Sequence, residues 1–443
     1  MLGAAPARPD NLRYTARRHA AVRTDDYVYS QLIPYIGNKR KLLPLIYRGL
    51  AHTGAAGSFV DLFAGSTVVA RFAKTLGFQV LANDWEPYAY EIAAATVALN
   101  AAPPFARLGG AARVFDHLNA LPPLDGYVAR HLCPRDDARP DPERERLFFT
   151  RHNGQRIDAV REQVAAWEAD GLLAPGERAY LLSALVYAVS YVSNTSGVFK
   201  GFHRGWGGAT ATALYRIQST LRLRPPPLFD NGQPNVALRQ DAQALAGRLR
   251  EALGRQPDVV YLDPPYNQHP YGSNYHLLNT VVLWDKPPLR PTIRVGGRVR
   301  DKSAIRRDWR TERRSPYNVA REALPAFRRL LEALDARWLL ASYSTDGNMP
   351  LEELLAALAA RGRATVFTET YKRYRVSAPR MSPRPRTVEF LVVVDTAARP
   401  SASGAEELLA AIRRQELALR GEADPGAGGG RGRLAVSCGA TPR

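Results

Sequence analysis

Five short apolar runs recur along this sequence, and helix-like segments lie between them. Two of these segments are residues 87–100 and 315–335, in which apolar residues repeat with helical spacing. Short strands that are apolar on both faces and alternate with helices form mainly parallel sheets covered by helices. We therefore predict an α/β fold built on such a sheet. The five predicted strands are 58–64, 79–84, 258–263, 337–344 and 387–395.

The stretch between the second and third runs departs from this alternation. It reads as mostly helical and contains two polar strings, FFTRHNGQRID at 148–158 and SNTSGVFKGFHRGWGG at 193–208. We interpret residues 106–235 as a helical domain inserted into the α/β domain, whose two halves are then residues 26–105 and 236–398. The ends of the chain are predicted to be flexible tails: residues 1–25, and residues 399–443, which are rich in glycine but include one short helix-like stretch.

The chain carries an excess of positive charge, with 61 lysines and arginines against 42 aspartates and glutamates. The net charge of +19 favours a polyanionic partner, which is a nucleic acid or an anionic membrane surface. No apolar run approaches the ~18 residues of a membrane span, and the N-terminus lacks the apolar stretch of a signal peptide. Two cysteines, Cys133 and Cys438, exclude a disulfide framework and a cysteine-rich zinc site. We therefore predict a cytoplasmic protein that binds nucleic acid, with no membrane association and no metal site.

The most specific motif is Asp263-Pro264-Pro265-Tyr266, at the end of the predicted strand 258–263. In open α/β sheets, ligands bind beyond the carboxyl ends of the strands. Proline has no N–H group but keeps its carbonyl acceptor, so the motif offers a carboxylate, a fixed carbonyl and an aromatic ring. An exocyclic amino group on a flat base needs two acceptors for its N–H bonds and a ring to stack on. Taken alone, the motif could also be a proline-rich turn without a function.

A glycine-bearing turn follows the first predicted strand, in the sequence DLFAGS at 61–66. Such a turn lets a ligand approach the backbone and the helix N-terminus, although glycine also ends many strands that bind nothing. The second predicted strand ends in Asp84, about 20 residues further on, where an acid commonly accepts ribose hydroxyls. A helix N-cap is an equally good interpretation of Asp84. Together, the turn and the acid indicate a cofactor of the adenosine type.

Before the first strand stands the sequence YIGNK at 35–39, which by composition alone reads as a basic helix start. The order of YIGNK, DLFAGS, Asp84 and DPPY resembles the adenine-specific DNA methyltransferases of the DNA adenine methylase family, alpha group. The resemblance covers roughly residues 31–396, and the long insertion falls where that family has its target-recognition domain. It implies a Rossmann-like S-adenosylmethionine-dependent methyltransferase sheet with a mostly helical inserted target-recognition domain, in a prokaryotic cytoplasm.

The resemblance also implies which residues bind S-adenosylmethionine. One departure from the family pattern is Thr67, which stands where many members have a second glycine. Threonine narrows the turn without removing the site. The implied cofactor residues are Tyr35, Gly37 and Lys39 before the first strand, Asp61, Phe63 and Gly65 on the methionine side, Asp84 at the ribose hydroxyls, Asp241 near the cofactor adenine, and Asp263.

For the reaction, the resemblance implies methyl transfer to N6 of an adenine that is flipped out of duplex DNA. Asp263 and the Pro264 carbonyl would bind the amino group, Pro265 completes the rigid turn, and Tyr266 would stack on the base. When these two groups accept hydrogen bonds from the amino group, the nitrogen lone pair leaves conjugation with the ring and points at the methyl group. The transfer is then a direct in-line displacement, dominated by positioning and electrostatics. The implied enzyme is a site-specific adenine methyltransferase, of the kind that serves a restriction-modification system.

Two basic segments are candidates for contacts with double-stranded DNA. The first, 294–314, interleaves arginine with Trp309, but its interspersed acidic residues also fit a solvated charged loop. The second lies in the insertion, where a turn packed around Trp206 is the alternative. The candidate DNA-binding residues are Lys200, His203, Arg204, Arg306, Arg307, Arg310, Arg313 and Arg314.

Three other interpretations are weighed against this one. An adenine in RNA has the same acceptor chemistry as an adenine in DNA. A DNA-binding module with an inactive site is disfavoured, because every expected catalytic residue is present. A fusion with a nuclease would need a nuclease motif, which the short predicted tails do not hold. The predicted partners are double-stranded DNA and, as a separate protein, a cognate restriction endonuclease, and we expect the enzyme to act as a monomer.

Overall fold

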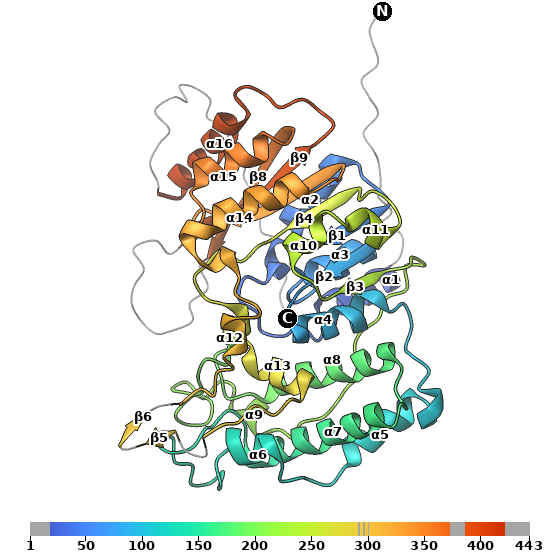
Figure 1. Cartoon of the computed structure of the whole chain (residues 1–443), viewed down its shortest axis with the longest axis vertical. Helices are drawn as coiled ribbons and strands as arrows, with labels where there is room; N and C mark the ends of the chain where they lie inside the picture. The colour runs from blue at the N-terminus through green and yellow to red at the C-terminus, as the bar shows by residue number, and fades with distance from the viewer. Residues whose placement is uncertain (1–17, 291–292, 296, 300, 373–385, 421–443) are drawn as a thin grey trace, which may run out of the picture.

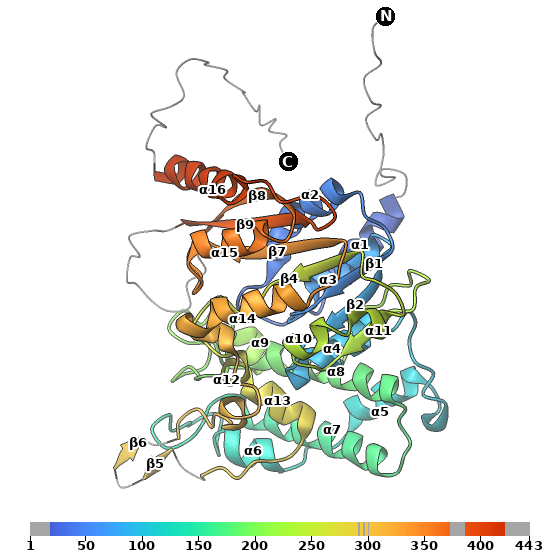
Figure 2. The same cartoon turned by 45° about the horizontal axis from the view of Figure 1, so that its top comes forward.

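The computed structural model describes residues 18–290, 293–295, 297–299, 301–372 and 386–420. A seven-stranded sheet fills one part of the molecule, and a helical layer lies beside it (Figure 1). Helices cover both faces of the sheet (Figure 2): α10, α11, α14, α15 and α16 pack on one face, and α1, α2 and α3 on the other. The predicted α/β architecture with a sheet between helices is therefore confirmed.

The strand order in the sheet is β3-β2-β1-β4-β7-β9-β8. Neighbouring strands from β3 to β7 are parallel, whereas β9 is antiparallel to both β7 and β8. The order reverses at β1, and open α/β sheets bind ligands at such a switch point. The strands are β1 Ser58–Asp61, β2 Gln79–Asn83, β3 Val236–Leu238, β4 Val259–Leu262, β7 Trp338–Ser344, β8 Arg363–Lys372 and β9 Arg386–Asp395, with a separate antiparallel pair, β5 Arg294–Val295 and β6 Arg298–Val299.

All five predicted strands are present, as β1, β2, β4, β7 and β9. Their valine-rich centres are buried on both faces, as Val60, Val80 and Val260 illustrate with 0% exposure. Strands β3 and β8 were not predicted, and both lie at the edges of the sheet. The first half of the sheet is therefore assembled from strands about 200 residues apart, because β1 pairs with β4 across the insertion.

Nine helices belong to the sheet region of the described chain. Two of them fall in segments that the sequence assigned to flexible tails: α1 begins before residue 26, and α16 follows residue 399. In α16, Leu408 and Ile412 are buried against the sheet-side core, so the amphipathic stretch here is part of the fold. The helices are α1 Arg18–Tyr29, α2 Leu43–Thr53, α3 Val68–Thr75, α4 Pro87–Ala93, α10 Ala242–Ala246, α11 Leu249–Leu253, α14 Ala320–Ala333, α15 Leu351–Ala359 and α16 Gly404–Arg420.

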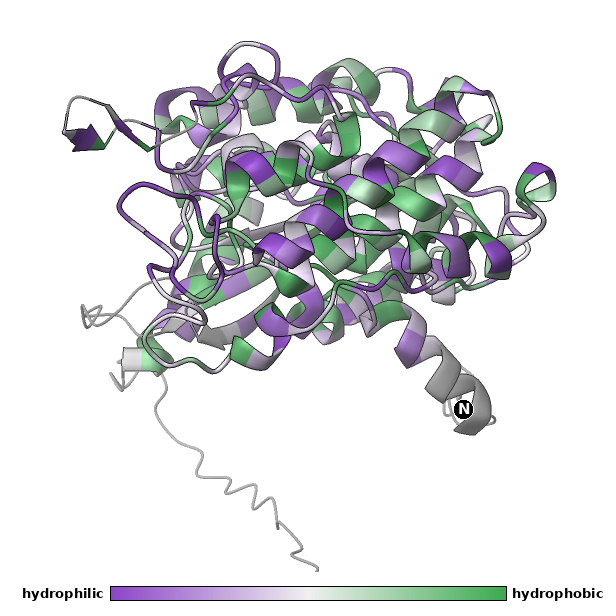
Figure 3. Ribbon diagram, turned by 90° about the horizontal axis from the view of Figure 1, so that it is seen from below, coloured by the Kyte–Doolittle hydropathy of each residue, from purple (hydrophilic) through white to green (hydrophobic). Residues whose placement is uncertain are grey.

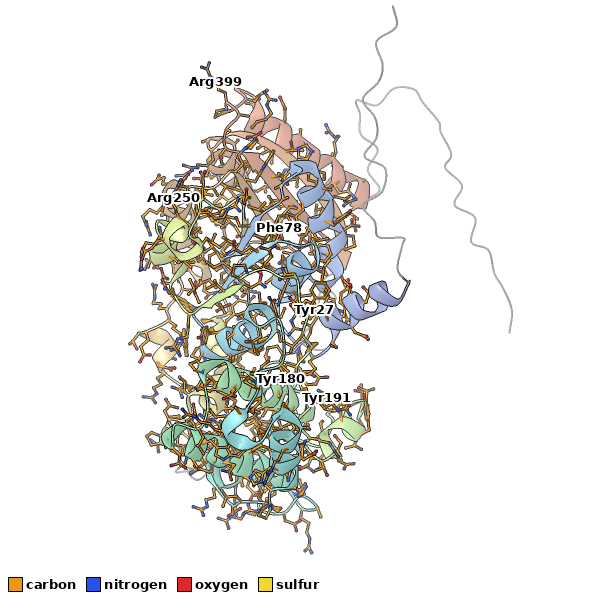
Figure 4. All side chains as sticks on the ribbon, turned by 90° about the vertical axis from the view of Figure 1, so that its right-hand side faces the viewer. Tyr27, Phe78, Tyr180, Tyr191, Arg250 and Arg399 are labelled. Atoms are coloured by element: carbon orange, nitrogen blue, oxygen red, sulfur yellow. The ribbon has the colours of Figure 1, made fainter. Side chains whose placement is uncertain are left out.

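Residues 106–235 contain helices and no strand, as the sequence predicted. Their apolar core is shared with α4 and with α12 and α13, which lie outside this stretch: Tyr88, Leu277 and Val281 are buried in it. Figure 4 shows the labelled Tyr180 and Tyr191 on α8 in this layer, and Figure 3 shows apolar and hydrophilic residues alternating along its helices. The helices are α5 Ala111–Ala120, α6 Tyr127–Leu132, α7 Arg151–Ala169, α8 Pro175–Val192 and α9 Leu214–Gln218, followed by α12 Tyr271–Asn274 and α13 His276–Leu283.

Several short helices connect these elements. The short helices are the 3-10 turns Lys39–Leu42, Ala106–Leu108, Asp308–Arg310 and Pro316–Asn318, and the π-helical segment Ala94–Ala98.

In the described part of the chain, no helix is long and apolar enough to cross a membrane.

Candidate active site

Three neighbouring strands bring aspartates to one edge of the sheet. β1 ends at Asp61, β2 is followed by Asp84, and β4 is followed by Asp263. Because these strands are parallel neighbours, their carboxyl ends meet at the switch point. Burial raises the pKa of Asp61 well above its usual range, and the charge of Asp263 raises it further. The sheet therefore gathers acidic groups in one place.

A cavity opens at this edge, lined by residues from both halves of the α/β domain. Phe63 and Tyr317 meet edge to face in its wall, with ring centroids 5.6 Å apart. This arrangement pairs aromatic surface with carboxylates, which suits a ligand that is part flat ring and part hydroxyl. The lining residues come from segments 35–37, 62–63, 83–86, 240–243 and 315–317, from Asp263 and Pro265, and from Tyr271, Ala326 and Arg329.

Stacked tyrosines hold one wall of this cavity. The Tyr35 ring stacks on Tyr271 and on Tyr275, with centroid distances of 5.1 Å and 4.9 Å. The Tyr271 hydroxyl donates to the Ile36 carbonyl at 2.9 Å, and the Ile36 N–H donates to the Tyr275 hydroxyl at 2.8 Å. The backbone of Ile36 is therefore fixed on both sides by residues that follow DPPY.

The rest of the YIGNK segment turns toward DPPY. Gly37 has a φ of +76°, and a Cβ there would lie 3.3 Å from the hydroxyls of both Tyr266 and Tyr271. The Asn38 side chain accepts a hydrogen bond from the Arg40 N–H at 2.7 Å and caps the short helix that begins at Lys39. Glycine therefore suits this position by its conformation and its small size, and the capped helix begins with Lys39, which pairs with Asp263.

Lys39 forms a buried ion pair with Asp263. The distance from Lys39 Nζ to Asp263 Oδ1 is 2.8 Å, and the Lys39 side chain is only 3% exposed. Burial raises the pKa of Asp263, and the neighbouring Lys39 charge counteracts that rise. Asp263 Oδ1 is buried, while the residue still lines the cavity. Lys39 therefore holds one carboxylate oxygen inward and leaves the other for a ligand.

The turn around DPPY is fixed from a neighbouring loop. The Asn348 N–H donates to the Tyr266 carbonyl at 3.0 Å, and the Tyr266 ring meets Tyr343 edge to face at 5.8 Å. Lys39 Nζ lies 5.0 Å from the centre of the same ring. Tyr266 is therefore seated between a cation and a tyrosine, beside the cavity that Asp263 and Pro265 line.

Asp84 is held by backbone N–H groups at the end of β2. Its Oδ2 accepts from Gly65 and its Oδ1 accepts from Glu86, each at 2.9 Å. Burial raises its pKa to about 6, and these N–H groups limit the rise. The Asp84 side chain does not cap α4, whose N-cap residue is Glu86. A carboxylate fixed in this way keeps spare lone pairs directed into the cavity, where they can accept hydroxyl hydrogens.

Gly65 brings the turn close to Tyr35. Its φ is +48°, and a Cβ there would lie 2.7 Å from Tyr35 Cε1. Thr67, two residues on, also has a left-handed backbone, with a φ of 65°, and its N–H donates to the Ala64 carbonyl at 2.6 Å. The tight turn is therefore formed with threonine at the position where the related family has glycine.

We expect Gly65→Ala to destabilise the protein by about 2–3 kcal/mol and to weaken cofactor binding. The backbone strain of alanine in the left-handed region costs about 1–2 kcal/mol, and the clash with Tyr35 adds overpacking of similar size. Gly54→Ala is the matched control, because Gly54 has a φ of +60° and a Cβ added there would meet no atom within 4 Å. Denaturant unfolding checks the prediction, which equal destabilisation of the two variants would contradict.

The cofactor residues that the sequence implied fall into two groups. Lys39, Asp61 and Gly65 lie behind the cavity wall, through their contacts with Asp263 and Asp84. They shape the wall and do not form its surface. The remaining ones line the cavity: Tyr35, Gly37, Phe63, Asp84, Asp241 and Asp263.

The arginines after DPPY differ in their surroundings. Arg306 forms two hydrogen bonds of 2.6 Å with Asp285 and one of 2.9 Å with Asp308, and its side chain is 8% exposed. Arg313 pairs with Asp308 at 2.7 Å and is 10% exposed. We therefore reassign Arg306 and Arg313 from phosphate contacts to internal ion pairs. Of the others, Arg314 pairs with Glu322 at 2.8 Å, whereas Arg307 and Arg310 are exposed.

The basic residues of the inserted stretch lie around a packed turn. The His203 N–H donates to the Asn194 carbonyl at 3.0 Å, and Trp206 Nε1 donates to the Asp137 carbonyl at 3.0 Å. Arg204 is exposed and pairs with Glu143, and Lys200 is half-buried. The structure therefore shows a turn packed around Trp206, and the same turn carries an exposed cation, Arg204.

Sequence reasoning did not single out Tyr271, Tyr275 or Glu86. Tyr271 begins α12, and Tyr275 stands directly after it, before α13. The spacing of four residues is the one that places side chains on one face of a helix, and this signal could have found them. Glu86 lines the cavity and accepts from Asn279 Nδ2 at 2.6 Å. Burial raises its pKa to about 7, although Arg313 counteracts the rise. Its partners lie far away in the sequence, so no local pattern revealed it.

Comparisons with known proteins agree with this geometry. Residues 35–292 match the family model of D12 class N6 adenine-specific DNA methyltransferases. The chain is 30% identical to modification methylase StsI of Streptococcus sanguinis and to type II methyltransferase M.FokI of Planomicrobium okeanokoites, over 77% of the chain and 48% of each relative. It is 29% identical to M.NlaIII of Neisseria lactamica, over 77% of the chain and 92% of that relative. The chain thus spans about half the length of the first two relatives. No solved structure matches it significantly.

Proposed function

The chain belongs to the D12 class N6 adenine-specific DNA methyltransferase family, and on this premise we propose that it methylates N6 of adenine at specific sites in duplex DNA. The observation that carries the proposal is the Asp263 carboxylate at the switch point, with one oxygen held by Lys39 at 2.8 Å and the residue facing a cavity. Of the named relatives, StsI is a modification methylase and M.FokI is a type II methyltransferase. We propose the same role, in a restriction-modification system, for this chain.

The methyl donor that fits the cavity is S-adenosylmethionine. Two features of the cavity support this assignment: Asp84 presents a fixed carboxylate suited to ribose hydroxyls, and Phe63 and Tyr317 give the wall an aromatic surface. Phe63 and Tyr317, which contact each other edge to face, offer aromatic surface against which a flat ring would pack, and Asp241 lines the same cavity. When bound, S-adenosylmethionine supplies an electrophilic methyl group. The residues present therefore match an adenosine at one end and a positive charge beside Asp263 at the other.

In the reaction, the chain positions the target amino group. Two acceptors take hydrogen bonds from the two N–H groups of N6. One is the Asp263 oxygen that Lys39 does not hold, and the other is the carbonyl of Pro264. The nitrogen lone pair then leaves conjugation with the ring, and the base stacks beside Tyr266. Asp263 takes up the proton that the amino group loses after methylation, because the methylated amino group is acidic. Catalysis of this kind depends on orientation and on preorganised charges.

The partner we propose is duplex DNA, with the target base flipped out of the helix. The exposed Arg307 and Arg310 follow DPPY in the chain and are the residues we assign to phosphate contacts, together with Arg204, Lys200 and His203 around the Trp206 turn. We further propose that the enzyme acts as a monomer in a prokaryotic cytoplasm. A restriction endonuclease would serve the same system as a separate protein.

The double variant Arg307→Ala/Arg310→Ala is expected to bind duplex DNA more weakly and with a smaller salt dependence. The slope of log affinity against log salt falls by about 0.9 for each phosphate that the protein no longer neutralises. Arg306→Ala is the matched control: it should lower the unfolding free energy by about 1–3 kcal/mol, because Asp285 and Asp308 lose a charged donor. Filter binding across salt concentrations checks the prediction. An unchanged slope in the double variant would remove these two arginines from the interface.

The proposal is tested with purified protein, tritiated S-adenosylmethionine and three substrates: unmodified plasmid duplex, single-stranded DNA and a structured RNA. Mass spectrometry of the hydrolysed nucleosides is expected to find N6-methyladenine in the duplex, and long-read sequencing then gives one short sequence context. Label in RNA alone would replace DNA by RNA as the substrate. Cofactor binding without label in any substrate would indicate a binding module and overturn the proposal.

A further inference from the structure

A second buried carboxylate lies beside the Lys39–Asp263 pair. Glu389 stands on β9, two strands away from β4 in the sheet, and its side chain is buried, with 5% of the residue exposed. Lys39 and Asp263 are the two charges that act most strongly on it. Glu389 Oε2 has no hydrogen-bond partner among the described residues. A buried carboxylate oxygen without a donor is costly, so its place within reach of the Lys39 charge calls for an explanation.

Lys39 keeps its charge in an apolar position because of these neighbours. Burial alone would lower the pKa of Lys39, but Asp263, followed by Tyr266 and Glu389, raises it well above its usual range. Of its three N–H groups, one donates to the Gly37 carbonyl at 3.2 Å and one meets Asp263 at 2.8 Å. Lys39 therefore feels the charge of two carboxylates, Asp263 in an ion pair and Glu389 from further away, and of these three residues only Asp263 lines the cavity.

We propose that Glu389 is a positioning residue for methyl transfer, which acts through Lys39 on the Asp263 carboxylate. The proposal rests on the function proposed above. As a second anion near Lys39, Glu389 helps to keep the ammonium charged and offsets part of its attraction to Asp263. The cavity-facing oxygen of Asp263 then stays a strong acceptor for the amino group. When Glu389 is neutral, the whole Lys39 charge falls on Asp263, and that oxygen becomes a weaker acceptor.

The surroundings of Glu389 set the pH at which this happens. Burial raises its pKa to about 7, Lys39 counteracts the rise, and Asp263 and Asp346 add to it. Ser344, opposite Glu389 on β7, gives a hydrogen bond that lowers the pKa. On β8, Glu369 stands opposite Glu389 but pairs with Arg48 from α2 at 3.0 Å. Glu389 is therefore ionised above about pH 7, and its effect is lost as the pH falls through that value.

The test compares wild type with Glu389→Gln at saturating S-adenosylmethionine, in single-turnover methylation of plasmid duplex across pH. We expect wild type to lose rate below about pH 7. In Glu389→Gln the rate above pH 8 should fall about tenfold, which is the equivalent of one pKa unit of interaction, and the decline near pH 7 should disappear. The dissociation constant for S-adenosylmethionine should stay within about twofold, since Glu389 does not line the cavity. Wild-type rate and pH profile in Glu389→Gln would overturn the proposal.

Glu369→Gln is the matched control on the neighbouring strand, and it should keep the wild-type rate and profile. Ser344→Ala keeps the Glu389 charge but removes the hydrogen bond that lowers its pKa, so the decline should move to higher pH. Ser344→Ala therefore provides the test if Glu389→Gln fails to fold. The proposal is refuted if the rate of Ser344→Ala declines at the same pH as the rate of wild type.

A second readout separates this inference from the proposed function. The chain has seven lysines, so ε-carbon labelling gives few NMR signals, and Lys39→Arg identifies the one from Lys39. That signal should shift near pH 7 in wild type and stay constant in Glu389→Gln. If wild type methylates no nucleic acid but the Lys39 signal titrates, the proposed function fails while the charge coupling stands. If the signal does not titrate, the coupling fails whatever the activity.

Discussion

Asp263→Ala is expected to slow methyl transfer about 10²–10³-fold while the protein still binds S-adenosylmethionine. The variant removes the charged acceptor of the amino group, and losing one preorganised hydrogen-bonding group at a reacting centre costs about 10²–10³-fold in rate. Asp263→Asn should lose a similar amount, because its amide can present a donor to the donor on N6. Asp84 and Phe63 are untouched, so cofactor affinity should stay within about fivefold. Single-turnover rates and calorimetric titration measure the two effects separately.

The control for this variant is Asp335→Ala, which removes an exposed carboxylate that pairs with Arg250 at 3.1 Å. It should leave both rate and affinity unchanged. Thermal unfolding accompanies each assay, because Asp263→Ala leaves the Lys39 ammonium buried without its nearest counter-ion. An active Asp263→Ala protein would refute the assignment of DPPY as the acceptor of the amino group.

Asp84→Ala is expected to weaken S-adenosylmethionine binding at least about 100-fold. Hydrogen bonds to a charged group contribute about 1.5–3 kcal/mol each, and a ribose offers two hydroxyls. In the wild-type protein, the N–H groups of Gly65 and Glu86 each donate to Asp84 at 2.9 Å. The variant leaves both of these groups without that acceptor. Asp84→Asn keeps one carbonyl acceptor and should show an intermediate loss. Calorimetric titration with the cofactor that has lost its methyl group measures the affinity of both variants. Unchanged affinity in Asp84→Ala would mean that another residue accepts the ribose hydroxyls.

The same carboxylate predicts how cofactor affinity depends on pH. Burial raises the pKa of Asp84 to about 6, and the ionised form is the one that accepts hydroxyl hydrogens. Affinity should therefore be full above about pH 7 and fall as the pH drops through 6. Asp84→Asn has no charge to lose, and its affinity should not decline at this pH.

The parallel part of the fold could be predicted because its strands are short, continuous and apolar. β3 was missed because it has only three half-buried residues, Val236–Leu238, and lies at an edge of the sheet. β8 was missed because RATVFTETYK mixes polar and apolar residues, as an edge strand with one solvated side does. The helix in residues 404–420 was visible as a pattern, but only its contact with the sheet shows that it belongs to the core.

The candidate site could be predicted as a set of motifs and not as a geometry. DPPY, DLFAGS and Asp84 fall at the strand ends where sequence logic puts them, because parallel topology dictates that position. The Lys39–Asp263 pair joins residues 224 positions apart, and no local pattern indicates which carboxylate a lysine will meet. Composition also could not separate Arg306 from Arg307, since the two are adjacent and only burial tells them apart.

The pairing of β1 with β4 has a consequence for synthesis on the ribosome. Ser58 donates to Asp258 across 200 residues, and at about 5–20 residues per second this interval takes roughly 10–40 s to translate. Until then, the first strands of the nascent chain expose a strand edge that β4 will cover. Such an edge invites pairing with other chains. We therefore expect unfinished chains to be most prone to pair with one another in the interval before β4 leaves the ribosome.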